Sequence, residues 1–135
     1  MAYQKKIDSV PRCPFEYGLH VFGGKWNARV ICLLSRQKAL HFQQIRAELE
    51  DITDSVLSGA LRELSAHGIV SRTAYNEIPP RVEYALTEKG LSIVPLLESI
   101  CRWSQLHHEM NETALLSPCR QCPHRNSASS SHGAL

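Results

Sequence analysis

One stretch decides the fold of this chain: residues 79–90, which read PPRVEYALTEKG. Its two prolines cannot donate hydrogen bonds to a β-ladder, so they belong in a connection and leave the β-branched and aromatic residues beside them to pair. Arg81–Leu86 therefore predicts a strand, and Thr87–Gly90 opens a helix. The stretch predicts a stiff turn, a strand and a helix start in succession.

A second strand and a capped helix precede this stretch. Ile69–Tyr75 is rich in strand-forming residues and is joined to Arg81–Leu86 by Asn76–Pro80, which predicts a β-hairpin. Before it, Thr53 is placed to cap a helix, and Gly68 follows the helix where a left-handed residue is needed. The side chains expected on the buried face of this helix are Val56, Leu57, Ala60, Leu61 and Leu64.

The first half of the chain predicts three further helices. Apolar residues recur at spacings of three and four over Cys13–Leu34, and Gly23-Gly24 in the middle predicts a break between two helices. Leu40–Phe42 predicts a very short strand, and the apolar spacing over Phe42–Leu49 predicts a short third helix.

A long final helix begins at Thr87, with a bend expected at Pro95. It carries more apolar surface than one small domain needs to cover, which favours a twofold dimer built on this helix and the first one. The apolar stripe of this helix consists of Leu91, Val94, Leu97, Ile100, Trp103 and Leu106.

This order of elements is that of a winged helix-turn-helix. The predicted fold class is mainly α with a small β-hairpin, and the N- and C-terminal helices are expected to dimerise. We expect a flexible N-terminus over residues 1–11, the winged domain with its dimerisation helices over 12–110, and a flexible tail rich in Cys and Ser over 111–135.

Composition restricts the class of protein. The chain has 135 residues, of which 43% are hydrophobic and 21% charged, as in one globular domain that folds without disulfides. No apolar run approaches the roughly 18 residues of a membrane span, so we expect a cytoplasmic protein without membrane contact. Residues 1–46 carry eight Lys and Arg against two Asp and Glu, which suits a polyanionic partner but equally a solvated basic face.

Several motifs also carry a family resemblance. In order they are CPFE at 13–16, GGKW at 23–26, FQQI at 42–45, LREL at 61–64, GIV at 68–70 and the long stretch at 79–90. Together they resemble the HxlR family of bacterial transcriptional regulators over about residues 12–108. The resemblance implies a homodimeric, DNA-binding winged helix-turn-helix protein, often responsive to electrophiles or oxidants through an N-terminal cysteine.

The helix after Thr53 is the candidate reader of the DNA major groove. Small hydroxyl side chains can approach phosphates or base edges, a glycine lets the backbone pass closely, and an arginine can read a base. An ion pair is the alternative role for the arginine. The family commonly has a basic residue at the position of Ser55, so an operator sequence cannot be borrowed from relatives. The candidate DNA-binding residues of this helix are Thr53, Ser55, Ser58, Gly59 and Arg62.

Three further cations are candidate DNA contacts. Lys25 suits a general phosphate contact or a solvated charge. Arg72 and Arg81 lie on the hairpin, where either one can reach a minor groove or the backbone, or pair instead with Glu77 or Glu83.

Cys13 is the candidate redox-sensing residue. It precedes Pro14 at a helix start and follows Arg12, so the helix dipole and the neighbouring charge favour a thiolate. A filler of a helix-start pocket is the alternative. Cys101, from the other subunit of a dimer, is the first choice of disulfide partner, with Cys119 or Cys122 of the tail next. A core or interface position is the alternative role for Cys101. Cys32 lies among apolar residues and is expected in the core.

The remaining cysteines and the histidines predict no metal site and no cofactor. Cys119 and Cys122 with His124 are a weak zinc signal, and a flexible thiol pair is favoured. His20, His107 and His108 have no ligand partners at suitable spacing. A tail CxxC outside a βαβ unit also argues against a thiol oxidoreductase.

The sequence therefore predicts a DNA-binding transcriptional regulator and not an enzyme. We expect a repressor that binds an inverted-repeat operator as a homodimer, with a small electrophile or oxidant as effector. The alternative is a winged-helix interaction module without specific DNA binding.

Overall fold

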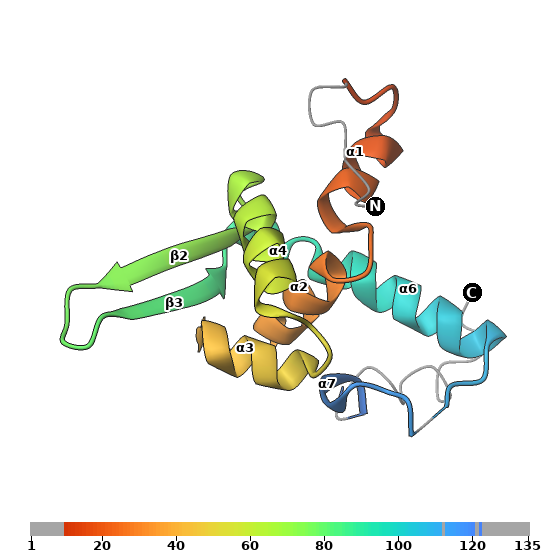
Figure 1. The fold of residues 1–135 in the computed structure, drawn as a ribbon. Helices are drawn as coiled ribbons and strands as arrows, with labels where there is room; N and C mark the ends of the chain where they lie inside the picture. The colour runs from red at the N-terminus through yellow and green to blue at the C-terminus, as the bar shows by residue number, and fades with distance from the viewer. Residues whose placement is uncertain (1–9, 112, 121, 123–135) are drawn as a thin grey trace.

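A computed structural model describes residues 10–111, 113–120 and 122. Helices and one small sheet alternate along the chain (Figure 1). The elements in chain order are α1 (Pro14–Phe22), α2 (Asn27–Ser35), β1 (Leu40–His41), α3 (Phe42–Leu49), α4 (Asp54–Ala66), β2 (Val70–Tyr75), β3 (Arg81–Leu86), α5 (Glu88–Leu91), α6 (Val94–His107) and α7 (Ser117–Arg120). The predicted fold class is confirmed.

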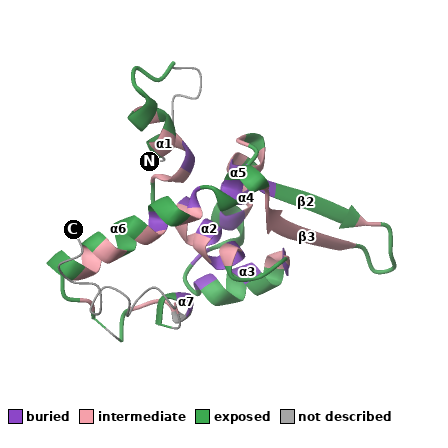
Figure 2. Ribbon diagram, turned by 180° about the vertical axis from the view of Figure 1, so that it is seen from behind, coloured by how far each residue is buried: buried purple, intermediate pink, exposed green. Residues whose placement is uncertain are grey.

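The core lies between α2, α3 and α4, where Figure 2 shows the buried residues gathered. Leu57, Leu61 and Leu64 recur at the spacing that keeps side chains on one face of a helix, and all three are buried. They meet residues of α2 and α3, among which the fully buried side chains are Val30, Ile31, Leu34, Ile45 and Leu49. Burial of large apolar side chains is the dominant stabilising contribution here.

The three strands form an antiparallel sheet in the order β1-β3-β2. Val70 pairs with Leu86 at one end of the hairpin and Tyr75 with Arg81 at the other. The two residues of β1 pair with the middle of β3. Because β3 has a neighbour on both sides, the wing is attached to the helical body, while its outer part projects away from it (Figure 1).

A close backbone approach joins the end of α4 to the start of α5. The Thr87 hydroxyl donates to the carbonyl of Gly68 at 2.6 Å and accepts from the amide of Gly90 at 3.0 Å. The amide of Thr87 donates to the carbonyl of Ile69 at 3.0 Å. A Cβ on Gly90 would collide with that same carbonyl oxygen, so only glycine fits there. Gly68 itself has φ +74°, the left-handed conformation expected after this helix.

The predicted single final helix is wrong in one respect. The chain forms α5 and α6 with an interruption at Ser92-Ile93, instead of one helix bent at Pro95. Proline has no amide proton to continue the helix and is favoured in a first helical turn, so Pro95 stands at the start of α6.

The predicted apolar stripe also needs correction. Leu97 is buried and Val94 is half-buried, and both pack on the chain's own core. Leu96, absent from the predicted stripe, is exposed instead. On α1 the side chains of Phe15, Tyr17 and Leu19 are exposed as well. The exposed apolar side chains of α5 and α6 are Leu91, Leu96, Ile100, Trp103 and Leu106.

Part of the predicted C-terminal tail is ordered in a short helix. α7 packs against α3, and the Arg36 guanidinium donates to the carbonyl of Pro118. The rest of the tail prediction, with His124, lies outside the described residues, as do residues 1–9. In the described part of the chain no helix has the length and apolar character needed to cross a membrane.

A pair of identical substitutions tests the close approach. Gly90→Ala should lower the free energy of unfolding by about 2 kcal/mol, the usual cost of overpacking against fixed atoms. Gly59→Ala, where an added Cβ meets nothing within 4 Å, should be neutral or stabilise α4 by up to about 1 kcal/mol. Urea unfolding measures both, and equal effects would refute the role of Gly90.

Candidate nucleic-acid interface

The helix-turn-helix consists of α3, a short turn and α4. Thr53 caps α4 as predicted, because its Oγ1 accepts from the amide of Val56 at 3.2 Å. The buried Ile52 holds the turn on the core. Arg46 of α3 forms an ion pair with Asp54 in the first turn of α4. The pair neutralises a carboxylate that would otherwise repel phosphate at the start of α4.

The outer face of α4 carries most of the predicted DNA-binding residues. Ser55 and Arg62 are exposed, and Ser58 is half-buried. Space beside Gly59 is open, since an added Cβ would touch nothing within 4 Å. Arg62 makes no ion pair with any residue of the described ranges, so the ion-pair alternative is not what the structure shows. The guanidinium is therefore available to a ligand on this face.

Val56 was assigned to the buried face of α4 and that prediction is wrong. Its side chain is 43% exposed. Leu57, Ala60, Leu61 and Leu64 already complete the inward spacing of three and four, and Val56 lies one residue earlier, about 100° around the helix. The spacing of the apolar residues in the sequence therefore already indicated that Val56 lies off the buried face. An exposed branched methyl on a recognition helix suits contact with a thymine methyl group.

The inner side of α4 is fixed by a buried polar contact. Asn27 is buried, and its side-chain amide donates to the carbonyl of Val21 at 3.0 Å and to Glu63 Oε1. These bonds tie the end of α1 and the start of α2 to α4. Sequence reasoning did not identify Asn27, because nothing in the local pattern distinguishes it from a solvated polar residue.

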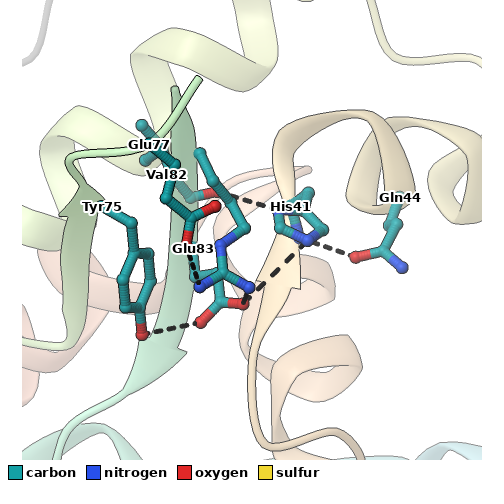
Figure 3. A network of polar contacts seen from close by, with 7 residues as sticks. His41, Gln44, Tyr75, Glu77, Val82 and Glu83 are labelled. Atoms are coloured by element: carbon teal, nitrogen blue, oxygen red, sulfur yellow. Dashed lines mark hydrogen bonds and ion pairs between the residues drawn. The ribbon is translucent and has the colours of Figure 1, made fainter. Parts of the chain in front are cut away.

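Arg81 pairs with Tyr75 at the outer end of the hairpin, next to the turn, and belongs to a polar network whose partners Tyr75, Glu77 and Glu83 are labelled in Figure 3. Its guanidinium contacts Glu77 at 3.1 Å and Glu83 at 3.5 Å and lies over the Tyr75 ring at 4.0 Å. The Tyr75 hydroxyl donates to Glu83 at 3.1 Å. His41 contacts Glu83 at 4.0 Å and the carbonyl of Val82 at 3.2 Å, so the network also joins β1 to β3. Arg81 therefore pairs with Glu77 and Glu83, which is the alternative to a DNA contact that the sequence offered.

The other two predicted cations lie apart from this network. Arg72 is exposed on β2 opposite Tyr84. Lys25 is exposed between α1 and α2, with its ammonium 5.1 Å from the centre of the Trp26 ring. The structure thus gathers Thr53, Ser55, Ser58, Gly59 and Arg62 on one helix, places Arg72 on the wing and leaves Lys25 at a separate connection.

Cys13 lies at the N-cap of α1, as predicted, with extended backbone and an exposed side chain. A carboxylate that the sequence argument did not include lies close by: the amide of Arg12 donates to Glu16 at 2.7 Å. Cys101 is exposed on α6, and burial first and then the other thiols raise its pKa. Cys32 packs against the core, and burial raises its pKa to about 12, as an inert core thiol requires.

Within the described ranges no three His, Cys, Asp or Glu side chains are grouped closely enough to hold a metal ion.

Comparison with known proteins identifies the family of this chain. The family model described as HxlR-like helix-turn-helix matches residues 21–112. The chain belongs to the HxlR-like helix-turn-helix family. It is a DNA-binding transcriptional regulator with a winged helix-turn-helix, as the sequence predicted.

Relatives of this HxlR-like protein are described as HTH-type transcriptional regulators. It is 39% identical over 101 residues to an uncharacterised HTH-type transcriptional regulator of Halalkalibacterium halodurans, covering 75% of this chain and 89% of that one. It is 40% identical over 102 residues to one of Methanothermobacter thermautotrophicus, covering 76% and 77%.

Solved structures of two redox-related regulators are also similar. The redox regulator HypR in its oxidised form superposes with a TM-score of 0.67 at 36% identity, covering 73% of this chain and all, 100%, of that one. The reduced form of the transcriptional regulator YodB from Bacillus subtilis superposes with a TM-score of 0.65 at 29% identity, covering 73% and 97%.

Proposed function

We propose that this HxlR-like protein binds an inverted-repeat operator as a homodimer, with α4 in the major groove, and represses transcription. The observation that supports the proposal most directly is the outer face of α4. It combines an arginine that forms no ion pair within the described residues, small hydroxyl side chains and an open glycine next to a capped helix start. As its relatives are regulators, we propose no enzymatic activity, and we place its action in the cytoplasm with the DNA.

Each part of this face has a distinct task in the proposed complex. Arg62 reads a base edge, for which a bidentate contact to guanine is the commonest choice. Ser55 and Ser58 donate to phosphate or base oxygens, and Thr53 does so beside its capping role. The open space at Gly59 lets the DNA backbone or a base approach the helix closely.

The wing and Lys25 supply contacts that do not depend on sequence. Arg72 is exposed on β2 and is the wing cation that is not engaged in the Arg81 network. Arg81 acts as a positioning residue, because its pairs with Glu77 and Glu83 hold the outer end of the hairpin next to its turn. Lys25 contributes a phosphate contact.

The dimer is proposed from the two apolar helices outside the core. α1 and α6 extend from the helical body, and Figure 2 shows exposed residues along both. Phe15 is 71% exposed and Trp103 is 62% exposed. Exposed aromatic and aliphatic groups on a short chain mark an interaction surface. A twofold pairing here places the two α4 helices on half-sites about 34 Å apart.

Redox or electrophile sensing through Cys13 completes the proposal. Cys13 is exposed at the start of α1, one of the two helices of the proposed dimer surface. An adduct there changes how the subunits pack and so the spacing of the α4 helices. The similarity to a regulator crystallised in an oxidised form and to diamide-treated and quinone-bound forms of YodB supports this class of effector. Cys101 of the partner subunit is the proposed disulfide partner.

DNA-binding assays with arginine variants test the reading of the operator. Arg62→Ala should weaken operator binding by about 1 to 3 kcal/mol and relax sequence preference. Arg72→Ala should weaken binding to operator and random DNA alike and reduce the salt dependence. Fluorescence anisotropy over a salt series, with DNA from upstream of the protein's own gene, measures both. Equal losses of Arg62→Ala on both DNAs would reduce Arg62 to a phosphate contact, and absence of any preference in wild type would refute operator recognition.

The dimer surface is tested by charge insertion. Trp103→Glu should convert a dimer to a monomer at micromolar concentration, because it places a carboxylate in a desolvated interface. Ile78→Glu is the matched control, since Ile78 is an equally apolar and fully exposed residue on the wing. Light scattering gives the masses. A monomeric wild type, or two variants that both remain dimeric, would contradict the proposed interface.

The sensing role is tested with Cys13→Ser. Operator binding by wild type should be lost or altered after a quinone or hypochlorite pulse, and a thiol reductant should reverse a disulfide. The variant should keep its binding through the same pulse. If it loses binding as readily as wild type, Cys13 is not the sensor.

A further inference from the structure

A second thiol site lies far along the chain from Cys13. Four of the five cysteines, all within the described ranges, lie within electrostatic range of one another, although no three of them are close enough to hold a metal ion. Cys32 is on α2, Cys101 is on α6, which packs on α2, and Cys119 and Cys122 are at α7. Burial is the first cause that raises the pKa of Cys32, and the other three thiols all raise it further. Cys119 and Cys122 act on Cys101 in the same way.

The short helix α7 is held by a hydrogen bond from α2. The Arg36 guanidinium at the end of α2 donates to the carbonyl of Pro118, the buried residue next to Cys119. Arg36 and Cys32 lie one helical turn apart on α2. The short helix is therefore held at the C-terminal end of α2, where it also packs on α3.

Cys119 and Cys122 have a backbone arrangement that suits a disulfide. The amide of Cys122 donates to the carbonyl of Cys119 at 3.3 Å, which closes a turn between them. Such a turn holds the two Cα atoms within about 7 Å, close to the range that a disulfide requires. Two thiols at this spacing can be joined by a two-electron oxidation.

We propose that Cys119 and Cys122 form a reversible disulfide within one chain, oxidised by a low-molecular-weight disulfide. This site is separate from the proposed Cys13 sensor and does not depend on DNA binding. The Cys119 thiolate attacks one sulfur of the small disulfide, whose S–S bond breaks and releases one thiolate. The Cys122 thiolate then attacks Cys119 Sγ in the mixed disulfide and expels the second thiolate. The chain loses two electrons, and its two protons leave on the two small thiols.

The surroundings assign different roles to the four thiols. Cys119 is exposed whereas Cys122 is half-buried, so a small disulfide reaches Cys119 first and Cys119 is the attacking thiol. Burial first and then the Cys122 charge raise the pKa of Cys119, which makes its attack slower at neutral pH than that of an ordinary thiol. Cys32 packs against the core and stays a thiol. Cys101 is the neighbouring thiol on α6, through which the state of the pair is transmitted to the proposed dimer helix.

Mass spectrometry of the full chain tests the proposal. Cys13→Ser protein treated with oxidised glutathione should lose two hydrogens per chain, and peptide mapping should find the Cys119–Cys122 bond. Adding Cys122→Ser should replace this product with a glutathione adduct on Cys119. A Cys13→Ser chain that forms no bond between these two cysteines, or one whose bond joins chains, would overturn the proposal.

A second measurement tests whether the pair lies beside Cys101. A disulfide carries no charge, so closing it removes two thiolates that raise the pKa of Cys101. The midpoint of the pH–rate profile for alkylation of Cys101 should therefore move to lower pH in the oxidised protein. Arg36→Gln, which weakens the hold on Pro118, should reduce this shift. A profile that is identical in the reduced and oxidised protein would refute the proposed site.

Discussion

The contact of Gly90 with the carbonyl of Ile69 is the constraint on which the domain depends. At this point the chain leaves α4, enters the sheet, returns and begins the C-terminal helices within one small volume. Thr87 satisfies the backbone groups on both sides, and the missing side chain of Gly90 allows the two segments to touch. The position of the wing relative to the recognition helix is set here. The same contact sets the direction in which α6 leaves the core.

The recognition helix is held firmly on one side and left open on the other. Its inner leucines are buried, and the buried Asn27 amide bonds to the half-buried Glu63. A buried polar group that loses its partner costs about 1 to 3 kcal/mol, so this contact also fixes the rotation of α4 about its axis. The outer face can be small and polar because it takes no part in stability. Fold and recognition therefore use separate residues of one helix.

The sequence predicted those features that local chemistry determines. Thr53 and Gly68 set the ends of α4, the two prolines set the turn, and the residues after them set the strand and the family. Predictions failed where a second element decides the outcome. Leu97 is buried because α2 lies beside it, and nothing in the stripe itself distinguishes it from the exposed Leu96. The Arg81 network and the thiol cluster depend in the same way on residues brought together from distant segments.

The pairing of charges near the DNA-facing surface has a consequence for how the protein searches a genome. Arg46 is paired with Asp54, and Arg81 with Glu77 and Glu83, so each of these arginines already has a carboxylate partner that competes with phosphate. Non-specific affinity comes almost entirely from cations that displace counterions from the DNA. These two arginines therefore add little to the affinity for arbitrary DNA, and their carboxylate partners leave that task to exposed cations such as Arg72.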